Sequence, residues 1–211
     1  MLRELGIAVE EDKDHLPRME GIDRKVRDLV REEKVDAANF IVLNPGAKFA
    51  AKCWSAERFG EVARWAFSKW GARTLITGTA SEAGLAEAVA GASAGCAQSL
   101  AGRTSLLELA SLLRMARACV TNDTGTMHIA AMTHTPTVAL FATRLSPPVW
   151  WPLGNSVVGL CNMKDCECYY IEECTNSRCL HSITKDAVVS ALEKVGGYPR
   201  TVTLGGMPIG R

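Results

Sequence analysis

From Phe40 onward the sequence repeats one unit: a short β-rich apolar run, a turn of small residues and an amphipathic helix. The runs are NFIVLNPGA, RTLITGTASEAG, RACVTNDTG and TPTVALFA, and SVVGL at residues 156–160 is a candidate fifth. Strands that alternate with helices predict parallel βαβ units with right-handed crossovers. The sequence therefore predicts an α/β protein with a Rossmann-like, doubly wound parallel sheet.

Two of the intervening helices carry clear start signals. Ser55 can cap AERFGEVARWAFSKW, and Ser105 with Glu108 can form the capping box of LLELASLLRMA. The apolar face expected for the first of these helices consists of Phe59, Val62, Ala63, Ala66 and Phe67.

The pattern changes on either side of this repeat. GIDRKVRDLVREEK, at residues 21–34, has the apolar stripe of a surface helix. We expect residues 1–39 to be a lead-in or interdomain linker with its helix, and residues 40–211 to be the main domain, with a cysteine-rich segment at 161–179.

Composition argues against two classes of partner. The chain is 47% hydrophobic with a net charge of +1 and has no long basic run, so nucleic acid is not an expected partner. The start, MLRELGIAVEEDKDH, lacks the apolar core of a signal peptide, and no run approaches the ~20 apolar residues of a membrane span. We expect a cytoplasmic protein without a transmembrane segment.

Three turns of small and polar residues follow the predicted strands, at 44–46, 77–79 and 122–126. Ligands of doubly wound sheets bind beyond the carboxyl ends of the strands, which is where these turns fall. We therefore expect a binding site that all three turns share.

The turn at 122–126 joins a strand to a helix and can present backbone N–H groups to an anion. Thr124 and Gly125 would lie at the helix N-terminus, where unpaired donors and the positive end of the helix dipole favour a phosphate. The alternative is a capped turn in which Asp123 or Thr124 merely satisfies the helix start. His128 lies one turn inside this helix, where a lone histidine is more often structural than catalytic.

The turn at 44–46 is followed by Lys48 and Lys52, two cations beside another helix start. Ammonium groups beside N–H donors favour a diphosphate, although two solvated loop lysines remain the alternative. The segment is not a Walker sequence, because no Gly-Lys-Ser/Thr follows the glycine.

The turn at 77–79 opens TGTASEAG, which lacks the Gly-x-Gly-x-x-Gly order of dinucleotide-binding folds. An NAD site is therefore not expected. Glu82, at the opening of the next helix, could accept hydrogen bonds from ribose hydroxyls or could simply stabilise the helix dipole.

Taken together, NPGA...K.W...RF, TG...E, LAGRTSLLELASLL and NDTGTMHIAA resemble, in order and spacing, the C-terminal domain of glycosyltransferase family nine, the ADP-heptose:lipopolysaccharide heptosyltransferases. The resemblance covers roughly residues 40–180, and its most specific part is the Asp-Thr-Gly-x-x-His element. It implies the C-terminal half of a GT-B glycosyltransferase, which binds a nucleotide-sugar donor, ADP-heptose, for transfer to a lipopolysaccharide core acceptor.

The same resemblance implies roles for individual residues. The amides of Thr124 and Gly125 would hold the donor diphosphate and Lys52 would add charge. Glu82 would hold the ribose, and the segment around Arg103 and Thr104 would lie against the base. Asp123 and His128 would face the sugar or order the loop. Fixed donors and a lysine could assist departure of the diphosphate with neither a metal nor a cofactor, and Asp12-Lys13-Asp14 is interpreted as solvated surface.

In this family the acceptor-binding half, which carries the catalytic base, precedes the donor half. Nothing in residues 1–39 has its Gly-rich strand and loop. We therefore expect this chain alone to bind the donor without transferring sugar efficiently, and the identity of the base is left open. The alternative is a noncatalytic nucleotide-binding or interaction module.

Five of the eight cysteines crowd into the segment CNMKDCECYYIEECTNSRC. Their spacings are not the paired two-residue spacings of zinc ribbons and fingers, so free thiols or an opportunistic disulfide are favoured over a zinc site. Cys53, Cys96 and Cys119 stand alone and are expected to be small buried hydrophobes.

Overall fold

The computed structural model describes residues 16–142, 150–152, 156–162, 171, 174 and 176–196. At its centre is a six-stranded sheet whose described pairings are all parallel, in the order β3-β2-β1-β4-β5-β6. The strands are β1 (Phe40–Asn44), β2 (Arg73–Ile76), β3 (Ala97–Ser99), β4 (Ala118–Asn122), β5 (Thr137–Leu140) and β6 (Val157–Leu160). The strand order reverses between β1 and β4, which makes this pair the topological switch point. The predicted doubly wound parallel sheet is confirmed, and the candidate fifth run is β6.

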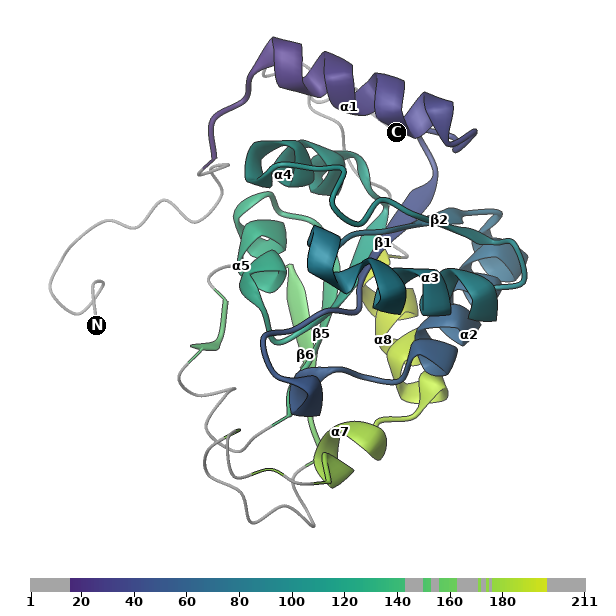
Figure 1. The fold of residues 1–211 in the computed structure, drawn as a ribbon, viewed down its shortest axis with the longest axis vertical. Helices are drawn as coiled ribbons and strands as arrows, with labels where there is room; N and C mark the ends of the chain where they lie inside the picture. The colour runs from purple at the N-terminus through teal and green to yellow at the C-terminus, as the bar shows by residue number, and fades with distance from the viewer. Residues whose placement is uncertain are drawn as a thin grey trace, which may run out of the picture.

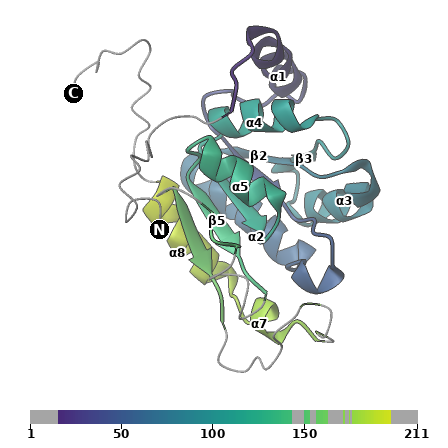
Figure 2. The same cartoon turned by 90° about the vertical axis from the view of Figure 1, so that its left-hand side faces the viewer.

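Helices cover both faces of the sheet (Figures 1 and 2). One face carries α2 (Ala56–Trp70), α3 (Ala83–Ala92) and α8 (Lys185–Gly196). The other carries α4 (Leu106–Met115) and α5 (Gly125–Met132), and α1 (Glu20–Glu32) packs on α4. The shorter elements are η2 (Ala50–Lys52), η3 (Ala80–Glu82) and α7 (Arg178–His181).

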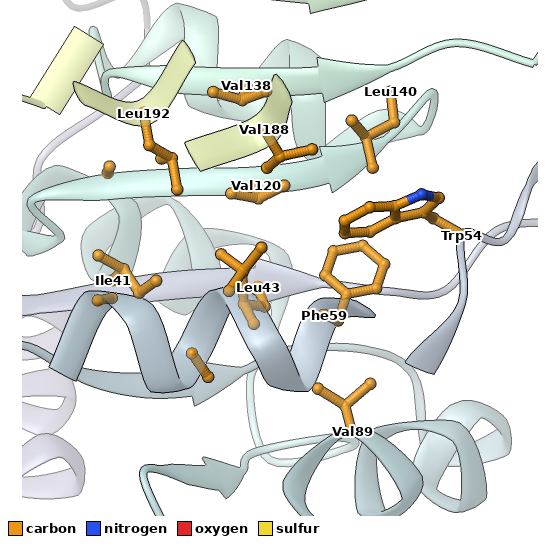
Figure 3. Close-up of a cluster of buried hydrophobic side chains, with 14 of the residues drawn as sticks. Ile41, Leu43, Trp54, Phe59, Val89, Val120, Val138, Leu140, Val188 and Leu192 are labelled. Carbon is orange, nitrogen blue, oxygen red and sulfur yellow. The ribbon is translucent and has the colours of Figure 1, made fainter. Parts of the chain in front are cut away.

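The strand sequences explain this two-sided cover. Every residue of β1 and of β4 is buried, as expected for parallel strands with helices on both faces. Ile41 and Leu43 join the core beneath α2 and α8 (Figure 3), whereas Phe40 and Val42 join the core beneath α4. The alternation along β1 thus divides the apolar side chains between two cores.

The predicted helix starts are confirmed, with one error in the apolar face of α2. Ser55 accepts a hydrogen bond from the Arg58 amide, and Ser105 and Glu108 form the reciprocal capping box. Phe67 is 45% exposed, although the other four residues of the predicted face are buried. Since it follows Ala66 directly, Phe67 lies about 100° further round the helix and leaves the buried stripe.

The cysteine and membrane expectations can be followed only in the described residues. Cys166 and Cys168 lie outside them, as do Asp12 and Asp14, and the isolated cysteines are buried only at Cys119. Within the described ranges, no group of three or more His, Cys, Asp or Glu side chains could hold a metal ion. No helix in that part of the chain is long and apolar enough to cross a membrane.

Candidate functional site

A cleft of about 690 Å³ opens beyond the carboxyl ends of β1, β2, β3 and β4. Its walls come from the loops that follow these strands and from the first turns of α4 and α5. The cleft therefore lies at the switch point of the sheet and has the volume of a small-molecule site. The three turns expected to share a site, at 44–46, 77–79 and 122–126, do meet here.

Two buried asparagines at the strand ends fix the relative positions of these loops. The Asn44 amide donates to the Thr77 carbonyl at 3.0 Å, and the Asn122 amide donates to the Pro45 carbonyl at 2.7 Å. Asn44 Oδ1 also accepts from the Thr124 hydroxyl at 3.4 Å. Each asparagine thus ties its own strand end to a neighbouring loop, which holds the rim of the cleft in one arrangement.

The cleft contains one close ion pair. Lys52, at the end of η2, places Nζ 2.7 Å from Asp123 Oδ2, and the two side chains are only 17% and 6% exposed. Lys48 also lines the cleft but is exposed, with its ammonium 5.3 Å from the Phe49 ring centre. Lys52 is therefore a positioned cation, and Lys48 matches the solvated alternative.

The N-terminus of α5 faces the cleft without a side-chain cap. Thr124, the N-cap residue, has an extended backbone and makes no capping hydrogen bond, because its hydroxyl is directed to Asn44 instead. The first N–H groups of a helix have no partner within the helix, so they are left to solvent or to a ligand. The alternative in which Thr124 caps this helix is wrong.

The packing and backbone of the fold do not require a glycine at position 125, the first residue of α5. A Cβ added there would meet no atom of another described element within 4 Å, and its φ is not positive. The position nevertheless lines the cleft. A missing side chain at this point keeps the cleft open where a ligand would approach the backbone.

Glu82 borders the cleft and is engaged with its own turn. Its carboxylate accepts from the Thr79 amide at 2.7 Å and the Thr79 hydroxyl at 2.9 Å, which completes a capping box at η3. A Cβ added to Gly46 would collide with this carboxylate. Glu82 thus caps its own turn through the Thr79 amide, and it does so at the edge of the cleft.

The structure brings six of the eight predicted site residues to the cleft: Lys52, Glu82, Thr104, Asp123, Thr124 and Gly125. Arg103 points the other way, toward Glu32 at 3.5 Å and toward Glu33, both at the C-terminal end of α1. His128 is partly buried on α5 and is not among the residues that line the cleft.

The sequence did not indicate that one side of the cleft is apolar. Leu106, Leu109 and Ile129 line this side, and Leu106 is 68% exposed. The available signal in the sequence was a large apolar residue, Leu106, directly after the helix cap Ser105. A cation, helix-start amides and an apolar surface in one cleft suit a ligand that joins a phosphate group to a flat apolar body.

Comparison with known proteins places these features in a family. Residues 5–179 match the model of glycosyltransferase family 9 (heptosyltransferase). The chain is 37% identical over 117 residues to lipopolysaccharide heptosyltransferase 2 of Salmonella typhimurium, which covers 53% of this chain and 33% of that protein. The chain thus spans about one third of the length of this curated relative.

Two solved structures share the fold. The ADP-heptose lipopolysaccharide heptosyltransferase II of Escherichia coli superposes with a TM-score of 0.70 at 25% identity, over 86% of this chain and 53% of that one. A family 9 glycosyltransferase from Veillonella parvula gives a TM-score of 0.77 at 22% identity, over 92% and 57%. At 22% identity the second match supports the fold alone.

Proposed function

This chain belongs to glycosyltransferase family 9, and from that premise we propose that its cleft is the nucleotide-sugar donor site of a heptosyltransferase-like enzyme. The proposed donor is ADP-heptose, the sugar nucleotide in the name of the similar E. coli structure. The proposed acceptor is a lipopolysaccharide core, because the curated relative is a lipopolysaccharide heptosyltransferase. The proposed location is the cytoplasm.

The observation that carries this proposal is the uncapped start of α5 beside Lys52. In the described part of the chain no side-chain cap covers the start of α5, and the amides of Thr124, Gly125 and Thr126 border one cleft with the Lys52 ammonium. A diphosphate could accept hydrogen bonds from both. The apolar wall at Leu106, Leu109 and Ile129 then supplies a surface for the base. An inorganic anion would use the first feature and leave the second empty.

The roles proposed for the remaining residues are compatible with their places. Glu82 would accept from the ribose hydroxyls, since its carboxylate borders the cleft. Thr104 would lie against the base, with Arg103 supporting that segment from outside. Asp123 would face the sugar, and His128, which is not among the residues that line the cleft, would order the loop.

These groups can stabilise a departing diphosphate without a metal. Negative charge grows on the diphosphate as its bond to the anomeric carbon of the sugar breaks, and fixed N–H donors with a lysine stabilise this charge in place. The two carboxylates that line the cleft, Asp123 and Glu82, are already engaged with Lys52 and Thr79. We therefore expect the base that activates the acceptor to lie outside residues 40–211, the proposed donor domain.

Residues 1–39 are proposed to join this domain to an acceptor-binding half.

Saturation-transfer NMR on the 211-residue chain tests the donor assignment, with ADP and AMP as ligands. ADP should receive saturation and AMP much less, because AMP lacks the second phosphate. Equal signals from ADP and AMP would refute a diphosphate site.

A transfer assay tests whether this chain needs an acceptor-binding half to transfer sugar. With ADP-heptose and a heptose-deficient lipopolysaccharide, the 211-residue chain should yield no product. The same chain joined to an acceptor domain from a family member should yield product. Donor binding without transfer in both cases would favour the noncatalytic nucleotide-binding module.

A further inference from the structure

We infer that Trp54 and Arg58 are positioning residues for Lys52, and that they act through the carbonyl of Ile183 in the segment before α8. The inference rests on the proposed function in one respect, that the anion bound near Lys52 is a nucleoside diphosphate. The geometric part concerns this chain alone and has its own test.

Trp54 is fixed at both of its polar ends. It is only 1% exposed, its backbone N–H donates to Asn122 Oδ1 at 3.3 Å, and its indole Nε1–H donates to the Ile183 carbonyl at 3.0 Å. The ring packs edge-on against Phe59, with 5.1 Å between the ring centres (Figure 3). A buried tryptophan held at two ends has little freedom to shift.

Arg58, in the first turn of α2, donates a hydrogen bond to the same carbonyl. Its Nη1 donates to the Ile183 carbonyl at 2.7 Å and also to the carbonyl of His181, and its guanidinium lies 5.9 Å from the Trp54 ring centre. Ile183 is itself 4% exposed, and it belongs to the core that α8 helps to form. The carbonyl of Ile183 is thus a fixed acceptor.

Trp54 lies two residues after Lys52 in the chain, and its hydrogen-bond partner Asn122 lies one residue before Asp123. The hydrogen bond from Trp54 to Asn122 joins the loop that carries Lys52 to the strand end that carries Asp123. The hydrogen bond from the Trp54 indole to the Ile183 carbonyl then fixes the position of that loop relative to the sheet. The 2.7 Å approach of Lys52 to Asp123 depends on both.

The first test measures Lys52 without any ligand. Acylation of lysines by an N-hydroxysuccinimide ester, read by peptide mass spectrometry, should label Lys52 slowly in the unmodified chain. Trp54→Phe, which keeps an aromatic ring and removes the indole donor, should raise the rate at Lys52 about five- to tenfold, the range of one lost hydrogen bond. Lys69, exposed and remote on α2, should keep its rate.

Arg58→Met provides a second variant in case Trp54→Phe does not fold, and Arg58→Lys should restore part of the protection. An unchanged Lys52 rate in a folded Trp54→Phe or Arg58→Met chain overturns the inference. An equal rise at Lys69 and Lys52 also overturns it, because that result shows general loosening.

The second test is a double-mutant cycle in ADP affinity between Trp54→Phe and Lys52→Ala. The Trp54 substitution should weaken ADP binding about five- to tenfold when Lys52 is present and should have no effect when Lys52 is alanine. Equal losses in both backgrounds would show that Trp54 does not act through Lys52. If the unmodified chain binds no ADP, the proposed function fails, and the acylation result still decides the positioning role.

Discussion

The ammonium of Lys52 lies 2.7 Å from Oδ2 of Asp123, although 71 positions separate the two residues in the chain. The sheet brings them together, because β1 and β4 are neighbours at the switch point and their carboxyl ends open into the same cleft. Each charge is largely withdrawn from water and is balanced by the other. An anion that enters the cleft therefore meets a cation that is already in place.

Lys52→Ala should weaken ADP binding by about 1–3 kcal/mol, since it removes a charge-assisted hydrogen bond. It should also lower the thermal midpoint, because the largely buried carboxylate of Asp123 loses the ammonium that lies 2.7 Å away. The double variant Lys52→Ala/Asp123→Asn also removes the negative charge of Asp123 and should recover part of the midpoint but not the ADP affinity. Thermal denaturation with and without ADP measures both effects.

The exposed Lys48 is the matched control, and Lys48→Ala should cost less affinity than Lys52→Ala. Equal losses from the two lysine variants would mean that ADP responds to the general charge of the loop.

Gly125→Ala separates binding from folding. The fold offers open space and an ordinary backbone at this position, so the free energy of unfolding should change by less than about 0.5 kcal/mol. ADP affinity should nevertheless fall by about 1–3 kcal/mol, because the new methyl group fills space that the ligand needs. Urea unfolding and equilibrium dialysis measure the two quantities. A variant that binds ADP normally would remove the α5 N-terminus from the diphosphate site.

Gly60→Ala makes the opposite comparison. There a Cβ would lie 2.5 Å from the Cβ of Ala92, so this variant should be destabilised through the packing of α2 on α3.

Arg103→Ala tests whether the Arg103 side chain contacts the carboxylates at the end of α1 or the nucleotide. Because its guanidinium is directed to Glu32 and Glu33 on α1, the substitution should change ADP affinity by less than about 0.5 kcal/mol. Hydrogen exchange in α1 should quicken. A loss of ADP affinity as large as that of Lys52→Ala would show that Arg103 contacts the nucleotide directly.

Much of this arrangement could be predicted from the sequence, because its signals are local. The apolar runs of β1 and β4 are continuous, and the capping residues Ser55 and Ser105 each lie directly before their helix. β3 was missed because Ala97–Ser99 is three residues long and mostly polar. Its strand conformation comes from pairing with β2, which is a tertiary contact.

The contacts at the site that the sequence did not indicate have the same origin. The outward direction of Arg103 depends on α1, which precedes it by about seventy positions and supplies two carboxylates. Likewise, the asparagines at positions 44 and 122 look like ordinary turn residues until β1 and β4 are paired. The turn chemistry of each strand end could be foreseen, but the contacts between the strand ends could not.

Glu108 links α4 to α1 and should make stability depend on pH. A hydrogen bond from Lys25 at 2.5 Å, assisted by the Ser105 amide, lowers the pKa of Glu108 to about 2. A carboxyl whose pKa is lowered by folding contributes stability above its unfolded pKa and loses that contribution as the pH falls toward the folded value. This contribution is present at pH 7 and should disappear between about pH 4.5 and 2.

Glu108→Gln should therefore cost about 1–2 kcal/mol at pH 7, a value reduced because Lys25 is mostly exposed. The cost should shrink to less than half at pH 3. Urea unfolding of both proteins at the two pH values measures it, and a cost that is the same at pH 7 and pH 3 would contradict the assignment.

The most direct measurement of the donor site is calorimetric titration of the 211-residue chain with ADP. The cleft presents the Lys52 ammonium, the amides at the start of α5 and the apolar wall at Leu106, so ADP should bind weakly but measurably, with one site per chain. Lys52→Ala should reduce the heat under the same conditions. No heat from ADP at millimolar concentration would contradict the assignment of this cleft as a nucleotide-sugar donor site.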